Sequence, residues 1–136
     1  MPRKIFMALD VGEKRIGVAL GDSGVRIAIP FTTIVVDGTE VGQIGSLVAK
    51  EAVDTLVIGY PRNQSGEATA QTKFVEDFAT QLKGVADELV FQDESLTSVL
   101  AEERLKSYGR PYKKGDVDAL AAAIILQDYI EVHNAA

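Results

Sequence analysis

The sequence predicts an α/β fold built on a mixed five-stranded sheet, in which an antiparallel meander joins parallel βαβ units and helices flank the sheet. Two patterns lead to this prediction: three strand-like segments separated only by turns in residues 5–36, and strands that alternate with amphipathic helices after residue 39. A strand–helix–strand sequence requires parallel neighbours joined by a right-handed crossover. At 136 residues the chain has the length of one domain, so we expect a single domain over residues 1–136.

The opening segment is expected to form the meander. Ile5–Leu9 is a continuous apolar run, the pattern of a strand that is buried on both faces. After a turn, Arg15–Leu20 alternates, which is typical of a strand with one buried face. A third strand is expected from Val25 through to Val36, and Pro30 within it suits an edge strand because proline cannot donate a hydrogen bond to a ladder.

Beyond residue 39 the apolar residues follow the spacing of helices and buried strands. The last helix shows the clearest apolar stripe, from Val117 to Ile125. Gly84 is expected to end the second helix, because glycine readily adopts the left-handed conformation that closes a helix. The expected elements, in order, are a helix over 39–52, a strand over 55–59, a helix over 68–83, a strand over 89–92, a helix over 97–109 and a final helix that carries the stripe.

Composition excludes several classes of function. The chain has no cysteine, which rules out disulfides, thiolate catalysis and Cys-ligated zinc or iron–sulfur sites. Its one histidine, His133, argues against a Ser-His-Asp triad and against a histidine-rich metal site. The apolar runs are only a few residues long, far short of a membrane span, so we expect a cytoplasmic protein.

Three acidic residues are expected to meet at the sheet edge where the parallel strands end, which is where open α/β sheets place ligand sites. Asp10 ends the first strand, Glu94 lies just past the fifth strand, and Asp118 occupies the first turn of the last helix. Each also has a purely structural interpretation. Asp10 could start a turn, Asp93 or Glu94 could precede a helix, and Asp116 or Asp118 could stabilise the helix dipole.

Carboxylates that are brought together repel one another unless a cation lies between them. Hard oxygen ligands without histidine or cysteine suit Mg²⁺ or Mn²⁺, and paired metals can activate water for phosphodiester cleavage. We therefore expect Asp10, Glu94 and Asp118 to be catalytic and to bind Mg²⁺ or Mn²⁺. Asp116 is the substitute candidate as a metal ligand if Asp118 serves only to start the helix.

The acidic chain contains one basic segment. Residues 104–114 hold five basic and no acidic residues, which leaves nine basic against twenty acidic residues elsewhere and a net charge of −6 overall. Gly109 and Pro111 indicate a loop within this segment, and Tyr108 and Tyr112 offer faces on which an unpaired base can stack. The alternative is a solvated helix end and loop whose tyrosines pack on the core.

A second candidate for phosphate binding is the loop over 59–67, where backbone amides, Arg62 and Asn63 follow a strand and precede a helix. A plain strand-to-helix connection explains this loop equally well, and the spacing of a Walker motif is absent. The residues expected to contact nucleic acid are Lys14, Arg15, Arg62, Asn63, Arg110, Lys113 and Lys114.

Four blocks of the sequence, taken in order, carry a family resemblance. They are Ala8–Ala19, Val57–Gly66, Asp93–Ser98 and Val117–Ala122. Together they resemble the YqgF family of RNase H-like proteins, described as Holliday junction resolvases or pre-16S rRNA nucleases. The resemblance implies an RNase H-like fold with strand order 3-2-1-4-5, and it places the acids at positions 10, 94 and 118 on the family's acidic triad.

Two positions depart from the family pattern. Ser95 stands where the family usually has arginine, which removes a cation near the expected metal site. Residues 64–67 read Gln-Ser-Gly-Glu, where an Asp-Gly-Ser pattern is more usual.

The resemblance implies a metal-dependent nuclease acting on structured RNA or branched DNA, with 5′-end processing of precursor 16S rRNA favoured over Holliday junction resolution. The expected partner is nucleic acid, bound by a monomer or a weak homodimer, with no membrane association. The alternative is a non-catalytic nucleic-acid or ribosome-binding module. An actin-like phosphotransferase would need two such domains around a cleft, and this chain has the length of one.

Overall fold

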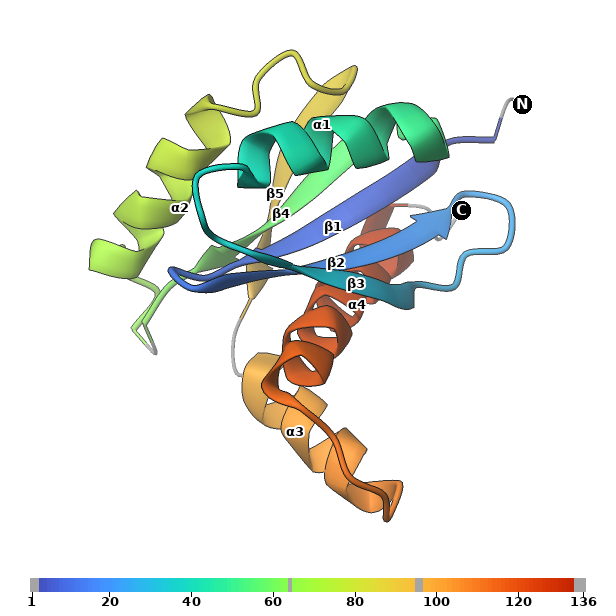
Figure 1. The fold of residues 1–136 in the computed structure, drawn as a ribbon, viewed down its shortest axis with the longest axis vertical. Coiled ribbons are helices and arrows are strands. Elements are labelled where there is room, and N and C mark those ends of the chain that lie inside the picture. The colour runs from blue at the N-terminus through green and yellow to red at the C-terminus, as the bar shows by residue number, and fades with distance from the viewer. Residues whose placement is uncertain (1–2, 64, 95–96, 134–136) are drawn as a thin grey trace.

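A computed structural model describes residues 3–63, 65–94 and 97–133. Its centre is a five-stranded sheet in the order β3-β2-β1-β4-β5 (Figure 1). The strands are β1 (Ile5–Val11), β2 (Arg15–Asp22), β3 (Ile29–Val35), β4 (Thr55–Pro61) and β5 (Glu88–Glu94). The helices are α1 (Glu40–Glu51), α2 (Ala70–Thr80), α3 (Thr97–Ser107) and α4 (Lys114–His133).

The pairing of the strands confirms the predicted mixed sheet. β1 pairs antiparallel with β2 and parallel with β4. β2 pairs antiparallel with β3, and β4 pairs parallel with β5. β1, β4 and β5 therefore end at one edge of the sheet, where Asp10, Pro61 and Glu94 lie. The strand order is the one that the family resemblance implies.

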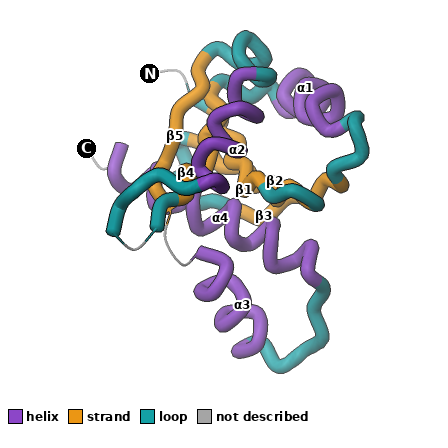
Figure 2. Tube along the Cα trace, turned by 90° about the vertical axis from the view of Figure 1, so that its left-hand side faces the viewer, coloured by secondary structure: helices purple, strands orange, loops and turns teal. Residues whose placement is uncertain are grey.

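Helices cover both faces of the sheet (Figures 1 and 2). On one face, Met7 and Leu9 of β1 pack with residues of α1 and α2. On the other face, Phe6 and Ala8 pack with α4, including its buried Ile125. Successive side chains of a strand point to opposite faces, which explains why neighbours in β1 belong to different cores. Each fully buried leucine or isoleucine contributes about 1.5–3 kcal/mol to stability.

α4 lies close to β2 because Gly17 has no side chain. A Cβ at position 17 would collide with the backbone carbonyl of Asp118. The apolar stripe predicted for the last helix lies in the core, where every residue over 119–126 is buried. This close packing brings the beginning of α4 to the end of β1, because Gly17 is the antiparallel partner of Asp10.

The third strand begins at Ile29, so the predicted start at Val25 is wrong. The carboxylate of Asp22 accepts hydrogen bonds from the backbone N–H groups of Gly24 and Val25 at 2.8 and 2.6 Å, which extends the preceding turn. Arg26 then has a φ of 66°, a left-handed conformation that a strand does not accommodate. The edge position predicted from the proline at position 30 is confirmed, since β3 is the outermost strand on its side.

The boundaries of two helices, α2 and α4, also differ from the prediction. α2 begins at residue 70 rather than 68, because Thr69 and Thr72 form a capping box in which each side chain accepts the other's backbone N–H. The helix ends at residue 80, and turns then lead to Gly84, which has a φ of 84°. α4 begins at Lys114, so Asp118 lies in its second turn rather than its first.

α3, the loop after it and the first turn of α4 extend away from the sheet (Figures 1 and 2). We call residues 97–116 the α3–α4 arm. Ala101 and Leu105 of α3 pack against α4. The hydroxyl of Thr33 in β3 donates to the carbonyl of Gly115 at 2.6 Å. The arm is therefore attached to the body of the fold at the beginning of α4.

Candidate active site at the carboxyl edge of the sheet

A cavity of about 240 Å³ lies at the edge where β1, β4 and β5 end, and the three predicted acids line it. Asp10 is the next-to-last residue of β1, Glu94 is the last residue of β5, and Asp118 lies in the second turn of α4. The structure thus brings together three residues that are far apart in the sequence. The other lining residues are Val11, Gly12, Arg15, Pro61 and Gln71.

Two glycines make room for the acids. Gly17 lets the backbone of α4 approach β2 directly beside Asp10. Gly59 of β4 lies next to the Glu94 side chain: a Cβ there would collide with Glu94 Oε2 and would lie 2.7 Å from Cδ1 of Ile125. The acids therefore converge because the sheet carries no side chain at these two positions.

The cavity concentrates negative charge. Burial and the neighbouring carboxylates of Glu94 and Asp118 raise the pKa of Asp10 from 3.8 to about 7. Asp118 has a positive neighbour, since Arg15 Nε lies 2.6 Å from Asp118 Oδ2. The two side chains of this ion pair are 35% and 20% exposed, so the pair is partly open to solvent. The pKa of Asp10 therefore lies near neutral pH, and the positive charge of Arg15 offsets the negative charge of Asp118.

The donor set fits a hard divalent cation. Three carboxylates from separate elements supply oxygen ligands only, the type that Mg²⁺ and Mn²⁺ prefer. Burial raises the pKa of Asp10 most, and the carboxylates of Glu94 and Asp118 raise it further. Among the described residues, no three acidic, histidine or cysteine side chains are already spaced as metal ligands, and Arg15 holds one oxygen of Asp118. The acids surround one cavity without forming a coordination shell.

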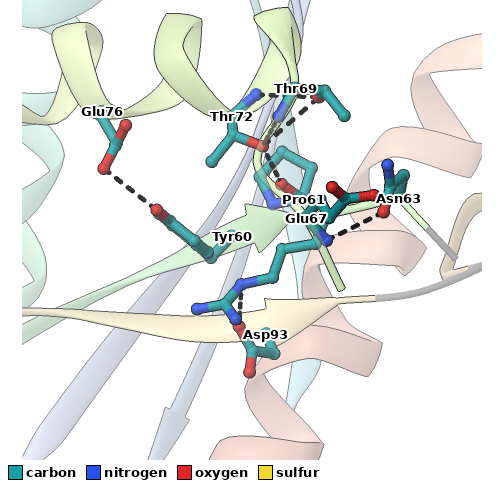
Figure 3. A network of polar contacts seen from close by, with 9 residues as sticks. Tyr60, Pro61, Asn63, Glu67, Thr69, Thr72, Glu76 and Asp93 are labelled. Atoms are coloured by element: carbon teal, nitrogen blue, oxygen red, sulfur yellow. Dashed lines mark hydrogen bonds and ion pairs between the residues drawn. The ribbon is translucent and has the colours of Figure 1, made fainter. Parts of the chain in front are cut away.

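Gln71 is a lining residue that the sequence analysis missed. It lies in the first turn of α2, and its side-chain amide donates to the Val11 carbonyl at 3.3 Å. Its position follows from how α2 begins: the hydroxyl of Thr72 donates to the carbonyl of Pro61, and Thr69 caps the helix (Figure 3). A lone glutamine in a helix belongs to no motif. The one available signal was its place just after the loop that follows β4.

The predicted phosphate-binding loop lies beside the cavity and uses its polar side chains internally. Asn63 Oδ1 accepts two backbone N–H groups of its own loop at 3.0 and 2.9 Å, one of them from Glu67 (Figure 3). Arg62 Nε lies 3.4 Å from Asp93 Oδ1, and the guanidinium lies 5.0 Å from the centroid of the Tyr60 ring. Arg62 lines a neighbouring cavity of about 400 Å³ rather than the cavity of the acids.

The remaining predicted residues lie apart from the acids. Asp116 lines a different cavity, and its Oδ2 accepts the backbone N–H of Lys113 at 2.9 Å, as a residue at a helix start does. Arg110 lines the same cavity as Asp116, whereas Lys113 and Lys114 are exposed. Lys14 is exposed in the turn between β1 and β2. Asp116 thus lies outside the cavity that Asp10, Glu94 and Asp118 line.

Ser95 and Gln64, which mark the two departures from the family pattern, lie outside the described residues. Within the described ranges, no helix is both long enough and apolar enough to cross a membrane. The side chains with chemical function in the described lining of the cavity are three carboxylates, the guanidinium of Arg15 and the amide of Gln71.

Comparison with solved structures supports the architecture. The structure described as "T. thermophilus RuvC in complex with Holliday junction substrate" matches with a TM-score of 0.55 over 95% of this chain and 94% of that chain, at 14% identity. A second Thermus thermophilus RuvC structure matches with a TM-score of 0.53 at 12% identity, covering 94% of this chain and 95% of that one. At such low identity the likeness shows the fold alone. The fold is therefore RNase H-like, with the acidic cavity at the carboxyl edge of its sheet.

A family model described as RuvX, Holliday junction resolvase, matches residues 4–132. The chain belongs to this family, which confirms the resemblance carried by the four sequence blocks. A relative from Chloroflexus aurantiacus, named "Putative pre-16S rRNA nuclease", is 43% identical over 136 residues, covering 96% of this chain and 89% of the relative. A relative of the same name from Rickettsia typhi is 39% identical, covering 93% of this chain and 85% of the relative.

Proposed function

We propose that this protein is a metal-dependent nuclease that hydrolyses phosphodiester bonds of structured nucleic acid, with Asp10, Glu94 and Asp118 as catalytic acids and metal ligands. One observation carries the proposal: Asp10 is largely buried at the end of β1, and its burial together with the other two acids raises its pKa to about 7. Such a cluster of carboxylates disfavours folding through repulsion, and a bound cation offsets that repulsion. The cluster is therefore best explained as a site that binds a cation.

Asp10, Glu94 and Asp118 would hold Mg²⁺ or Mn²⁺, and the ion would supply Lewis-acid chemistry for phosphodiester hydrolysis. The pKa of Asp10 is raised to about 7 in the metal-free cavity, and a bound cation would favour the ionised carboxylate. Arg15 orients Asp118 through the Nε–Oδ2 ion pair, and its other N–H groups are donors of the kind that bind phosphate. Gln71 holds the carbonyl of Val11, the residue after Asp10, and so fixes the end of β1.

As substrate we propose precursor 16S rRNA, processed at its 5′ end, because the names of the relatives refer to this RNA. A four-way DNA junction is the second candidate, favoured by the description of the family and by the fold shared with a RuvC structure that holds a Holliday junction substrate. We propose a monomer or a weak homodimer acting in the cytoplasm. A non-catalytic nucleic-acid or ribosome-binding module is the alternative that the test below separates from a nuclease.

The test is a cleavage assay on labelled precursor rRNA and four-way junctions in parallel, with Mg²⁺, with Mn²⁺ and with EDTA. Asp10→Asn, Glu94→Gln and Asp118→Asn should each lower the cleavage rate by about 100-fold or more while remaining folded. Asp87→Asn, the same kind of change at an exposed position before β5, should cleave like the wild type. Cleavage at the wild-type rate by Asp10→Asn would refute the assignment. Binding without cleavage by the wild type would favour the non-catalytic module.

A further inference from the structure

A second cavity, of about 620 Å³, lies where the α3–α4 arm meets the beginning of β3. It is larger than the cavity of the three acids, and its volume falls within the roughly 300–1,000 Å³ that is usual for ligand sites. Its lining comes from α3, the loop before α4, α4 itself, and Ala28 and Pro30. We call this cavity the arm recess. It shares no lining residue with the cavity of the three acids.

The side chains of the arm recess combine apolar and aromatic surface. Leu105 of α3 and Leu120 of α4 supply apolar surface. Tyr108 supplies a ring that is 50% exposed, and the Arg110 guanidinium lies 5.5 Å from the centroid of that ring. Tyr112 adds a second ring, whose hydroxyl is held by a hydrogen bond of 3.3 Å to a glutamate of α3. An exposed tyrosine–arginine stack beside apolar side chains is a platform on which a nucleobase can stack.

The charge of the arm recess favours an anion with a flat, polar edge. Arg104 and Arg110 line it within the basic segment 104–114, while the rest of the chain is strongly acidic. A polyanion that approaches this protein is therefore attracted to the arm. Among the described lining residues, Asp116 is the one acid, and its carboxylate repels a phosphate while it can accept an N–H group of a base. The base then belongs inside the recess and the phosphate outside.

The arm recess lies next to the proposed catalytic acids. Asp116 lines the recess and Asp118 lines the acidic cavity. The two residues are separated by a rise of about 3 Å along α4 and by about 200° around it, so the two cavities lie on different sides of the beginning of this helix. The hydrogen bond from Thr33 Oγ1 to the Gly115 carbonyl ties this end of α4 to β3 and holds the two cavities in a fixed relation. A nucleic-acid strand that passes around the beginning of α4 can therefore occupy both cavities.

We propose that the arm recess binds one unpaired nucleotide of the substrate, with its base stacked on the Tyr108–Arg110 pair and its backbone running around the beginning of α4 to the acids. The proposal rests on the nuclease function proposed above and adds which phosphodiester bond the protein selects: the bond that is cleaved lies next to a single-stranded nucleotide. RNA and DNA both have bases that can stack and a phosphate backbone, so both are included in the test.

The test measures binding in Ca²⁺, which suppresses cleavage, with hairpins that share one duplex and either end blunt or carry a single-stranded extension. Tyr108→Ala should weaken binding of the extended hairpin by about 5- to 150-fold, the effect of losing one base–aromatic stack, and leave the blunt hairpin unchanged. Tyr108→Phe, which keeps the ring, should bind both hairpins like the wild type. A 2-aminopurine in the extension should lose fluorescence on binding to the wild type and Tyr108→Phe, but not to Tyr108→Ala. RNA and DNA hairpins run side by side show which strand the recess prefers.

An equal loss of affinity for both hairpins, or no loss for either, would overturn the proposal, as would unchanged quenching with Tyr108→Ala. Because Tyr108 is half exposed, its truncation leaves the buried core in place, and circular dichroism checks that each variant is folded. Failure of the nuclease assignment would look different. The wild type would then bind the hairpins without cleaving its substrates in Mg²⁺ or Mn²⁺, while the preference for the extended hairpin would stay.

Discussion

Replacing Asp10 with asparagine should stabilise the protein when no metal is present, although the same change should abolish cleavage. The folded protein holds a proton on Asp10 more tightly than the unfolded chain does, because the pKa rises from 3.8 to about 7 in the cavity. Below pH 3.8 Asp10 is protonated in both the folded and the unfolded protein, so its burial does not lower the free energy of unfolding. Stability is therefore lost as the pH rises from about 4 through about 7, and asparagine escapes this loss because it carries no charge.

The size of the effect follows from the two pKa values. Each pKa unit corresponds to about 1.4 kcal/mol. Asp10→Asn should therefore exceed the wild type in free energy of unfolding by about 4 kcal/mol at pH 7.5 and by about 2 kcal/mol at pH 5. The change between the two pH values, about 2.5 kcal/mol, is the sharper quantity, since any packing difference between the two side chains is the same at both.

Urea unfolding in EDTA at pH 5 and pH 7.5 measures these free energies for the wild type, Asp10→Asn and Asp87→Asn. Asp87 is exposed at the opposite end of β5 from Glu94, so its variant should stay within about 0.5 kcal/mol of the wild type at both pH values. An advantage of Asp10→Asn that does not change with pH would refute the electrostatic reasoning. So would an Asp10→Asn protein that is less stable than the wild type at pH 7.5.

Mg²⁺ at a hundred times its dissociation constant should stabilise the wild type by about 2.7 kcal/mol and Asp10→Asn by much less, read as shifts of the urea midpoint; equal shifts would remove Asp10 from the metal site. Gly59→Ala should weaken this metal response, because its Cβ displaces the carboxylate at the end of β5, and should lower stability by about 1–3 kcal/mol. Gly42→Ala, at an exposed helix position with open space around it, should raise stability by up to about 1 kcal/mol and keep the metal response. Changing Lys113 and Lys114 together to alanine should remove up to two phosphate contacts. The slope of log affinity for nucleic acid against log salt concentration should then flatten by up to about 1.8, while the metal response stays intact. Superimposable salt titrations would mean that both lysines face water.

The parts of the fold nearest the acids were predictable because local patterns determine them. The apolar run Ile5–Leu9 identifies a strand buried on both faces, so Asp10 had to follow it at an edge of the sheet. The stripe from Val117 to Ile125 identifies a helix that lies on the sheet, with Asp118 beside the buried side. The strand order has a different origin, since it came from the family resemblance and not from periodicity.

The rest depends on contacts between distant segments, which spacing does not encode. Arg15 was expected to contact nucleic acid, and its ion pair with Asp118 joins residues 103 positions apart. Asp116 and Asp118 have similar local surroundings in the sequence, and only the packing of α4 over Gly17 determines which of them reaches the acidic cavity. The late start of the third strand arises because the Asp22 side chain takes up backbone N–H groups, a competition that hydrophobic alternation cannot reveal.

The 103-residue separation between Arg15 and Asp118 also bears on the order of events during synthesis on a ribosome. Asp10 and Arg15 emerge early, whereas Asp118 belongs to the last helix, and contacts between such distant residues form late in folding. A growing chain that has not yet produced α4 therefore carries two of the acids but no assembled cavity. A nuclease that needs all three acids cannot begin hydrolysis before α4 has been synthesised.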